Sequence, residues 1–370
     1  MSSTPEDSTV SPASTGDTVQ AGAGTPARRP DVSVRREAVA RVAELAIPVG
    51  GLGSLAELGC WLAACQGQCP PRAPVRSRVL LLAADHGVTA AGVSAYPAEA
   101  SRARAMAAGA ARLPVTVAAR AAGAAVRVVD VGLSQPSGSG EDGHVVTRGS
   151  GRIDREDALG EEQAELAYRT GQLLADEEID AGADVLVPAS LSVGATTPAA
   201  VLVAALTGAE PVAVVGRGSG IDDATWMRKA AVVRDALRRA RPYVREPLAL
   251  LRRVGGIDII ALAGVLARAA DRRVPVVLDG LAVGAAALVA DEVAPGAREW
   301  WLAAQASSEP AMTLVLEHLS LAPVLDLGIR TDDGTAAVAV LPLLVTAAGL
   351  LAETGSAAET GIVPLSGNAG

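Results

Sequence analysis

Short apolar runs alternate with segments of helical periodicity from about residue 32 to residue 353. A continuous apolar run of four to eight residues is typical of a buried strand, and a longer periodic segment is typical of a helix. On this basis strands are predicted at Val79–Leu82, Ala124–Val131, Asp184–Val187, Pro211–Val215 and Val274–Leu278. Helices are predicted at Val32–Glu44, Leu55–Gln66, Ala98–Ala122, Glu161–Glu178, Gly255–Ala270 and Ala336–Glu353. Strands separated by helices predict an α/β fold.

Two segments lack this periodicity. Residues 1–31 are mostly Ser, Thr, Pro, Gly and Ala with few apolar anchors, which predicts a disordered tail. Ser134–Gly151 is rich in Gly and Ser and predicts a mobile loop. Ser54, with Glu57 at the third helical position, predicts a capping box at the start of the second helix.

The composition limits the classes of protein and of partner. Half of the 370 residues are hydrophobic, mainly Ala, Val and Leu with no Phe, which is enough for one large domain or a large and a small one. The net charge of −9 argues against a nucleic-acid surface, so no nucleic-acid partner is expected.

The cysteines and the hydrophobic runs bear on the compartment. Cys60, Cys65 and Cys69 lie within ten residues of one another, and none of the three histidines is near them in sequence. A zinc site needs four ligands at recognisable spacing, so we expect no metal. Reduced thiols are the expected state of these cysteines. No uncharged run reaches the roughly 20 residues of a spanning helix, and the N-terminus lacks the order of a signal peptide. We therefore expect a soluble cytoplasmic protein with no membrane partner.

The stretch Ala83–Pro97, AADHGVTAAGVSAYP, carries the first candidate chemistry. Asp85 and His86 follow a predicted strand, and ligands of α/β sheets bind at strand ends. Ser94 and Tyr96 add a hydroxyl and a flat amphipathic ring. This combination favours a site for a small planar heterocycle.

Two loops that each follow an apolar run carry the second set of candidate residues. Pro188–Thr197 follows a predicted strand, and its backbone N–H groups suit a phosphate at a helix N-terminus. Gly216–Asp223, GRGSGIDD, also follows an apolar run; here Asp222 or Asp223 is alternatively a simple helix cap. Lys229 is either an exposed helical lysine or a cation that reaches a phosphate.

Asp332-Asp333-Gly334 is the last candidate. Asp-Gly is a strong turn former, so the segment is either an exposed turn or a source of carboxylates for a site.

These motifs, in this order from about Leu45 to Ala352, resemble the nicotinate-nucleotide–dimethylbenzimidazole phosphoribosyltransferases of cobalamin assembly. The likeness rests on DHGV…GVSAYP, GRGSGIDD, GGID, LDG, SSEP and PVLDLGIRTDDGT. It implies transfer of phosphoribose from nicotinate mononucleotide to 5,6-dimethylbenzimidazole, by a homodimer that needs no cofactor. It also implies a mostly parallel, Rossmann-like sheet at 76–335. Helices at 32–75 and 336–370 would contribute to a small helical domain.

The resemblance also implies roles for individual residues. Asp333 stands where the family has its proposed general base. The base-binding set is Ser94, Tyr96, Asp85 and His86. The phosphate- and ribose-binding set is Gly194, Thr196, Thr197, Gly216, Gly218, Gly220, Lys229 and Ser308.

The chain departs from the family motifs at several functional positions. Ile47 replaces a Lys, Ala103 a Gln, Ser190 an acidic residue, Ser192 a Gly, Ala195 an Asn, Gln305 and Met312 two His, Asp332 a Gly and Asp333 a Glu. Two alternatives therefore stay open beside the transferase. One is a paralogue, non-catalytic or of altered specificity, that binds a nucleotide or nucleobase. The other is a transferase that uses phosphoribosyl pyrophosphate, ranked last because the expected Thr-Gly-Gly-Thr loop is missing.

Overall fold

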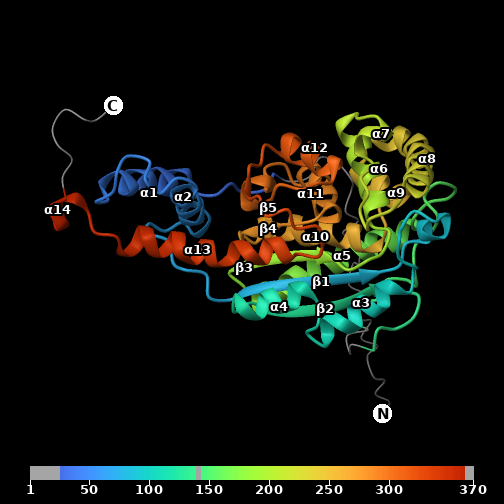
Figure 1. Ribbon diagram of the computed structural model, residues 1–370, viewed down its shortest axis with the longest axis horizontal. Coiled ribbons are helices and arrows are strands. Elements are labelled where there is room, and N and C mark those ends of the chain that lie inside the picture. The colour runs from blue at the N-terminus through green and yellow to red at the C-terminus, as the bar shows by residue number, and fades with distance from the viewer. Residues whose placement is uncertain (1–25, 139–142, 363–370) are drawn as a thin grey trace, which may run out of the picture.

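Six parallel strands form one sheet in the computed structural model, which describes residues 26–138 and 143–362 (Figure 1). The strands are β1 Ser77–Ala84, β2 Ala125–Gly132, β3 Val185–Ser190, β4 Val276–Leu278, β5 Trp301–Gln305 and β6 Pro323–Leu325. Their spatial order is β2-β1-β3-β4-β5-β6, and every pair is parallel. The predicted α/β fold with a parallel, Rossmann-like sheet is confirmed.

Helices cover both faces of this sheet. They are α1 Val32–Glu44, α2 Ser54–Gln66, α3 Ala100–Gly109, α4 Pro114–Ala121, α5 Glu161–Asp180, α6 Thr196–Thr207, α7 Pro211–Val214, α8 Asp223–Ala240, α9 Pro247–Val254, α10 Ile257–Asp271, α11 Leu281–Val293, α12 Pro310–Leu319, α13 Thr335–Glu353 and α14 Ala357–Thr360, with 3-10 turns at η1 Gly87–Ala91, η2 Arg241–Tyr243 and η3 Ala297–Trp300. α10 packs on β1, β2 and β3 and on α5, whereas α13 packs on β4, β5, β6 and α4. Parallel strands need crossover connections, and the helices of those connections supply part of this cover, whereas α13 follows the last strand.

Two predicted elements are wrong, and two strands were missed. Pro211–Val215 is the short helix α7, because Pro211 at the first helical position is already set for helical φ and a brief apolar run does not distinguish strand from buried helix. Ala98–Ala122 is two helices, which separate where Ala111 has a φ of 55° and Pro114 starts α4. β5 and β6 were not predicted.

The predicted capping box at α2 is also wrong. Ser54 is already the first helical residue, the N-cap is Gly53 at φ 48°, and no side chain caps it. At α8 the cap prediction is confirmed, because the Asp222 carboxylate accepts a hydrogen bond from Thr225 N.

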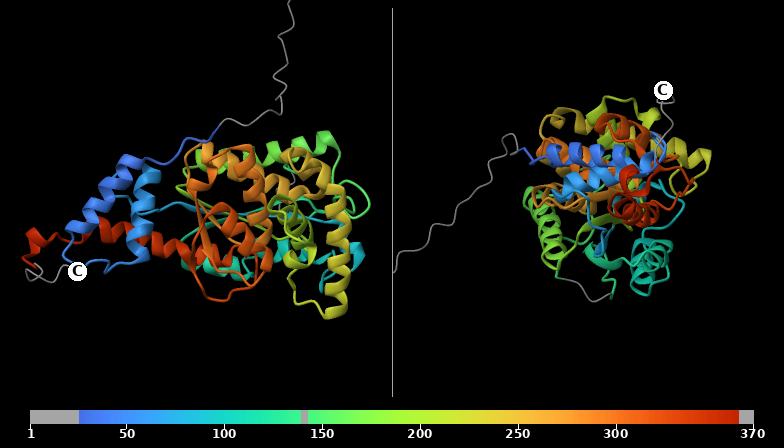
Figure 2. Two further views of the ribbon diagram at one scale, coloured as in Figure 1. Left: turned by 90° about the horizontal axis from the view of Figure 1, so that it is seen from above. Right: turned by 90° about the vertical axis from the view of Figure 1, so that its left-hand side faces the viewer.

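One end of the molecule is a small helical layer (Figure 2). α1 and α2 pack on each other and on α13. A second core there contains Ala38, Cys60, Ala63 and Leu351. Cys60 and Cys65 are buried free thiols, as the packing interpretation of this helix expects.

The described part of the predicted tail is tied to the segment around η3, just before β5. Residues 1–25 lie outside the described residues. Ala27 N donates to Pro295 O, Trp300 Nε1 donates to Arg28 O, and Arg29 pairs with Glu299. The boundary of a disordered segment at residue 31 is therefore wrong for residues 26–31.

The described part of the Ser134–Gly151 loop is also anchored; residues 139–142 lie outside the described residues. Ser150 N donates to Asp85 O, and Gly87 N donates to Ser150 O. Arg148 forms an ion pair with the buried Asp130. These flanks are therefore fixed against the end of β1.

α13 is long and apolar enough to cross a membrane by length and composition, with half of that window buried in the fold. The expectation that no segment reaches this length is therefore not met. A core helix passes the same test, and α13 contacts α2, α4 and three strands.

The close contact of α5 with α10 gives a stability prediction. A Cβ on Gly171 would lie 1.8 Å from the Ala261 carbonyl oxygen, which is backbone and cannot swing away. We expect Gly171→Ala to lower the free energy of unfolding by at least about 2 kcal/mol, because overpacking forces the helices apart. Chemical denaturation measures this change. Gly349→Ala in α13 is the control, since its Cβ meets nothing within 4 Å; it is expected to be stabilising by roughly 0.5–1 kcal/mol. An equal effect of the two substitutions would contradict the prediction.

Candidate active site

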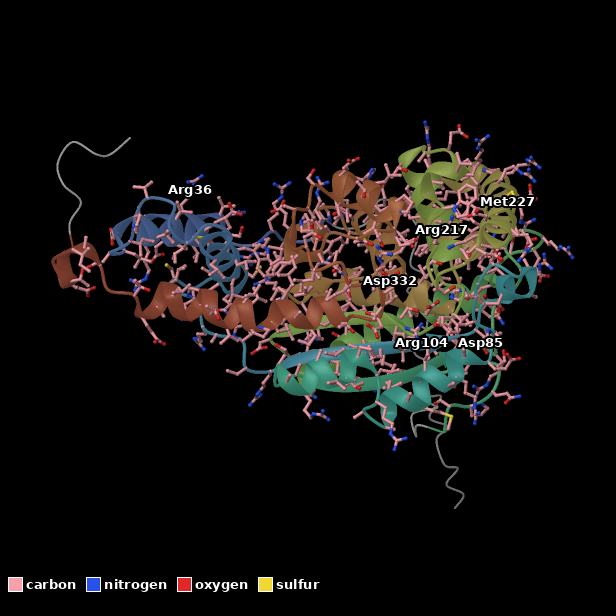
Figure 3. The ribbon with its side chains drawn as sticks, in the orientation of Figure 1. Arg36, Asp85, Arg104, Arg217, Met227 and Asp332 are labelled. Atoms are coloured by element: carbon pink, nitrogen blue, oxygen red, sulfur yellow. The ribbon has the colours of Figure 1, made fainter. Side chains whose placement is uncertain are left out.

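The carboxyl ends of the strands converge on one edge of the sheet. The strand order reverses between β1 and β3, and ligands of open α/β sheets bind outside such a reversal. Asp85 follows β1, Ser190 ends β3, Asp279 follows β4 and Gln305 ends β5. Figure 3 shows Asp332 near the middle of the molecule, between Arg217 of the loop before α8 and Arg104 of α3.

Lys229 is a buried cation at this edge. Its side chain is 1% exposed, so the interpretation as an exposed helical lysine is wrong. Its Nζ donates to Thr196 Oγ1 at 2.9 Å and lies 3.5 Å from Gly216 O. Burial lowers the pKa of Lys229, while the charges of Glu309 and Asp332 oppose that shift. α8 thus brings a positive charge to the loops Pro188–Thr197 and Gly216–Asp223.

Glu309 faces this cation from the other side. Its Oε1 accepts a hydrogen bond of 2.7 Å from Gly218 N, and its buried Oε2 has no hydrogen-bond partner in the described part of the chain. A Cβ on Gly216 would lie 2.0 Å from Oε2. Because Gly216 has no side chain, the Glu309 carboxylate can reach the Gly216–Gly220 loop. There it accepts from Gly218 N, a backbone donor that would also suit a phosphate.

The base-binding candidates Ser94 and Tyr96 lie against the same loop. Ser94 Oγ is 3.3 Å from Ser219 Oγ, and Ala95 N donates to that same oxygen at 2.9 Å. Tyr96 is 59% exposed. The structure thus brings the segment after β1 next to the Gly216–Gly220 loop, although the two are far apart in sequence.

The loop after β3 completes the nucleotide side. Gly194 has a φ of 85°, and a Cβ there would meet the Thr89 methyl group at 2.7 Å. Thr197 is fully buried, and its Oγ1 has no partner among the described residues. Thr196 joins this loop to Lys229 through its hydroxyl. A Cβ built on Gly220, in the neighbouring loop, would meet nothing within 4 Å.

His86, Asp258 and Ser190 form a buried polar cluster below these loops. His86 Nε2 lies 3.0 Å from Asp258 Oδ1, and Ser190 Oγ donates to Asp258 Oδ2 at 2.6 Å. Burial raises the pKa of Asp258, but His86 and the serine hydroxyls outweigh it, and the pKa is lowered overall. Ser190 therefore stands where the family motifs have an acidic residue, and its hydroxyl donates to Asp258, a buried acid from another part of the chain.

Asp85 is partly buried beside this cluster. Its Oδ2 accepts a hydrogen bond from Ser134 N at 2.8 Å. Its Oδ1 is buried and has no partner in the described ranges 26–138 and 143–362. Of the two polar residues that follow β1, His86 is buried inward and Asp85 keeps an unused acceptor.

Three carboxyl groups gather where β4 ends and α13 begins. Asp279 Oδ2 accepts from Ala336 N at 3.0 Å, Asp332 Oδ2 accepts from Leu281 N at 3.1 Å, and Asp333 Oδ1 accepts from Thr335 N at 3.2 Å. Burial and the neighbouring Asp333 raise the pKa of Asp279 to about 6. Burial, Asp279 and Glu309 raise the pKa of Asp332 to about 7.

These raised pKa values predict a dependence of stability on pH. The protonated forms of Asp279 and Asp332 favour the folded chain, so their contribution is complete below about pH 4 and is lost as the pH rises through 6 and 7. We expect Asp279→Asn to gain stability relative to the parent chain between pH 5 and pH 8, by on the order of 2 kcal/mol. Denaturation curves across this range measure the difference. A difference that stays constant with pH would contradict the prediction.

Some predicted or altered positions lie apart from these contacts. Ser308 is exposed, whereas Met312 is buried against Gly284 of α11. Ala103 is exposed on α3. Gln305, by contrast, stays at the site, because its side chain bonds with both backbone groups of Ile329 and also interacts with the Asp279 carboxylate. The site-residue assignments, including Ser308 and Asp333, therefore stay predictions.

Four charged residues at this edge were not singled out from the sequence, namely Arg104, Asp258, Asp279 and Glu309. Asp258, Asp279 and Glu309 were visible within the family-like motifs GGID, LDG and SSEP, which was the available signal. Arg104 lay in an Ala/Arg helix with nothing to distinguish it.

Neither a metal cluster nor a hollow beside the edge strand changes this picture. Within residues 26–138 and 143–362, no three His, Cys, Asp or Glu side chains are grouped to hold a metal ion. An open hollow of about 480 Å³ lies at Ala108, Thr116, Arg120 and Val126, against the edge strand β2, and contains none of the predicted site residues.

Comparisons with known proteins agree with the fold and with the motifs. A family model described as phosphoribosyltransferase matches residues 27–362. The nicotinate-nucleotide–dimethylbenzimidazole phosphoribosyltransferase of Mycobacterium ulcerans is 49% identical over 346 residues, covering 93% of this chain and 97% of that protein. The enzyme of the same name from Mycobacterium tuberculosis is 48% identical over 338 residues, covering 91% and 94%.

Solved structures give the same result. The crystal structure of CobT from Thermus thermophilus superposes with a TM-score of 0.86 at 38% identity, covering 90% of this chain and 100% of that one. The match spans almost the whole chain in sequence and in fold, so this chain belongs to the phosphoribosyltransferase family that these proteins represent.

Proposed function

We propose that this chain transfers the phosphoribosyl group of nicotinate mononucleotide to 5,6-dimethylbenzimidazole. The products are nicotinate and α-ribazole 5′-phosphate, which serves the nucleotide loop of cobalamin. The names of the two mycobacterial relatives support this substrate pair. The observation that carries the proposal is the buried Lys229, which joins the loops Pro188–Thr197 and Gly216–Asp223 beside a cluster of carboxyl groups at the ends of the strands.

The loops and Lys229 suit the phosphate and ribose. Thr196, Gly218 and Lys229 lie within hydrogen-bond distance of one another or of Glu309, so an entering phosphate meets a cation, a hydroxyl and a backbone N–H group together. A cation and backbone donors fixed before the substrate arrives stabilise charge without reorganisation. Glu309 has to give up the Gly218 donor when the anion binds.

The reaction itself makes modest chemical demands. The pyridinium of nicotinate mononucleotide leaves as a neutral base, so no general acid has to protonate it. No pyrophosphate is released, so the leaving group itself brings no charge for Mg²⁺ to neutralise. The incoming benzimidazole attacks with one ring nitrogen, and its other nitrogen has to lose a proton to a base. Positioning of the two substrates and one carboxylate therefore account for the chemistry.

The test is release of nicotinate by the purified full chain, followed by chromatography. We expect release that depends on 5,6-dimethylbenzimidazole and proceeds with or without added Mg²⁺. Binding of the mononucleotide without any release would indicate the binding paralogue. Activity only with phosphoribosyl pyrophosphate and Mg²⁺ would indicate the other class of transferase.

We also propose that the protein acts as a homodimer in the cytoplasm. The dimer is supported by the resemblance of the whole chain to the family, and the cytoplasm by the free thiols Cys60, Cys65 and Cys69. Light scattering coupled to size exclusion measures the first, with twice the chain mass of 37.1 kDa expected. A monomer that retains full activity would contradict it.

A further inference from the structure

We propose that Arg104 of α3 binds the ring carboxylate of nicotinate mononucleotide, and that it makes the site select this substrate over nicotinamide mononucleotide, in which an amide replaces the carboxylate. This inference rests on the proposed function and deepens it. The phosphate is placed at Lys229, and the second negative group of the substrate is assigned to a second cation.

Arg104 lies on the inward side of α3. Ser101, three residues earlier, is fully buried, and its Oγ accepts a hydrogen bond of 3.0 Å from Val193 N in the loop after β3. Residues three or four apart lie on the same side of a helix. Ala105 and Ala108 on this side are buried, and Arg104 is partly buried. Arg104 therefore follows Ser101 on the side of α3 that is fixed to the nucleotide loop.

The guanidinium of Arg104 is not used by the fold. Within residues 26–138 and 143–362, no hydrogen bond or ion pair holds it. Four neighbouring arginines are bound by the fold; they are Arg102, which donates to Pro136 O, Arg148, which pairs with Asp130, Arg217, which pairs with Asp223, and Arg228, which donates to Gly92 O. In this part of the chain, the donors of Arg104 therefore remain available to a ligand.

The charge of Arg104 acts on the carboxyl cluster at the strand ends. Burial raises the pKa of Asp332 most, Asp279 and Glu309 add to this rise, and Arg104 opposes it. Figure 3 shows Arg104 below Asp332. Lys229 of α8 also interacts with the charge of Asp332. Two cations from different helices, α3 and α8, thus act on the same carboxyl group.

The proposed substrate has two negative groups at its two ends. One is the phosphate, and the other is the carboxylate of the pyridine ring. A carboxylate that enters a cluster of carboxyl groups is repelled unless a cation faces it. A guanidinium matches a planar carboxylate with two parallel hydrogen bonds, which an amide cannot accept in the same way. A second cation at the site therefore serves the second negative group.

The carboxylate keeps its charge throughout the reaction. The bond that breaks is the one between C1′ and the ring nitrogen, so the carboxylate is the same group in the mononucleotide and in released nicotinate. An interaction that is equally strong before and during the reaction lowers KM and leaves kcat unchanged. Arg104 is therefore a specificity-determining residue rather than a catalytic one.

The first experiment is calorimetry of the full chain with each mononucleotide, in the absence of a benzimidazole. We expect the parent chain to bind nicotinate mononucleotide about 10- to 100-fold more tightly than nicotinamide mononucleotide, because a hydrogen-bonded charge pair is at stake. In Arg104→Met this ratio is expected to fall to about threefold or less, whereas Arg104→Lys keeps the charge and part of the ratio. A parent chain without the preference, or an Arg104→Met variant that retains it, would overturn the inference.

Two controls locate the effect at the carboxylate. Arg330→Met removes an exposed arginine two residues before Asp332 and is expected to keep the parent ratio. Ribose 5-phosphate lacks the ring, so we expect it to bind the parent chain and Arg104→Met equally and Lys229→Met more weakly. Loss of the ratio in Arg330→Met alone, or weaker binding of ribose 5-phosphate by Arg104→Met, would contradict the assignment.

Initial-rate kinetics separate this inference from the proposed function. In Arg104→Met we expect KM for nicotinate mononucleotide to rise about 10- to 100-fold, while kcat stays within about twofold of the parent value. A lower kcat with an unchanged KM would overturn the inference. A parent chain that shows the preference in calorimetry but releases no nicotinate would overturn the proposed function and leave the assignment of Arg104 in place.

Discussion

Replacing Lys229 by methionine is expected to lower kcat/KM for nicotinate mononucleotide by a factor of about 10² to 10³. The Lys229 side chain is 1% exposed, and its Nζ contacts Thr196 Oγ1 and approaches Gly216 O. Methionine at this position would therefore leave the space between the two loops without this positive charge. Removing one fixed group that stabilises charge in the transition state typically costs a factor of this size. Methionine keeps the length and the apolar stem of the lysine, which limits the loss of packing.

Initial-rate kinetics on the purified variant measure this effect. Arg238→Met is the matched control, because Arg238 lies on the same helix with a side chain 74% exposed. It is expected to leave kcat/KM and the melting temperature unchanged within error. A Lys229→Met enzyme that keeps more than half of the parent kcat/KM while remaining folded would show that the phosphate binds elsewhere.

Replacing His86 by alanine is expected to lower the free energy of unfolding by about 3 kcal/mol. Asp258 is fully buried, and His86 Nε2 lies 3.0 Å from its Oδ1. Breaking a buried pair by removing one partner leaves an uncompensated charge, which is strongly destabilising. The hydroxyl of Ser190 still bonds Asp258 and keeps the cost from rising further.

A double-mutant cycle in chemical denaturation tests this explanation. In the Asp258→Asn background the cost of His86→Ala is expected to fall by at least about 1 kcal/mol, since no charge is left behind. His318→Ala, at an exposed position of α12, is the control and is expected to change stability by less than about 0.5 kcal/mol. Strict additivity of the two substitutions would contradict a coupled pair.

Much of the fold was predictable because buried parallel strands are short apolar runs. β1 to β4 and the helices α1, α5, α10 and α13 were found within a few residues of their bounds. β5 and β6 were missed because WLAAQ and PVL are brief and lie beside polar motifs. α7 was mistaken for a strand because four apolar residues have no period that separates the two structures.

The site was predictable as a set of loops, but the contacts between them were not. The motifs placed Lys229 near a phosphate loop, yet only the fold shows that it is buried and faces Glu309. Asp332 and Asp333 were adjacent in sequence and equivalent as carboxylates. Their contacts separate them, because Asp332 accepts a hydrogen bond from Leu281 N at the start of α11 while Asp333 accepts from Thr335. Pairs such as Ser190 and Asp258 are 68 residues apart, and nothing local predicts them.

The most direct test of the account is to identify the product that forms when the full chain is incubated with nicotinate mononucleotide and 5,6-dimethylbenzimidazole. Mass spectrometry and the anomeric proton signal together distinguish transfer from hydrolysis. The account predicts one α-ribazole 5′-phosphate for each nicotinate released. Release of nicotinate with ribose 5-phosphate, or a mononucleotide that is bound and left intact, would contradict it.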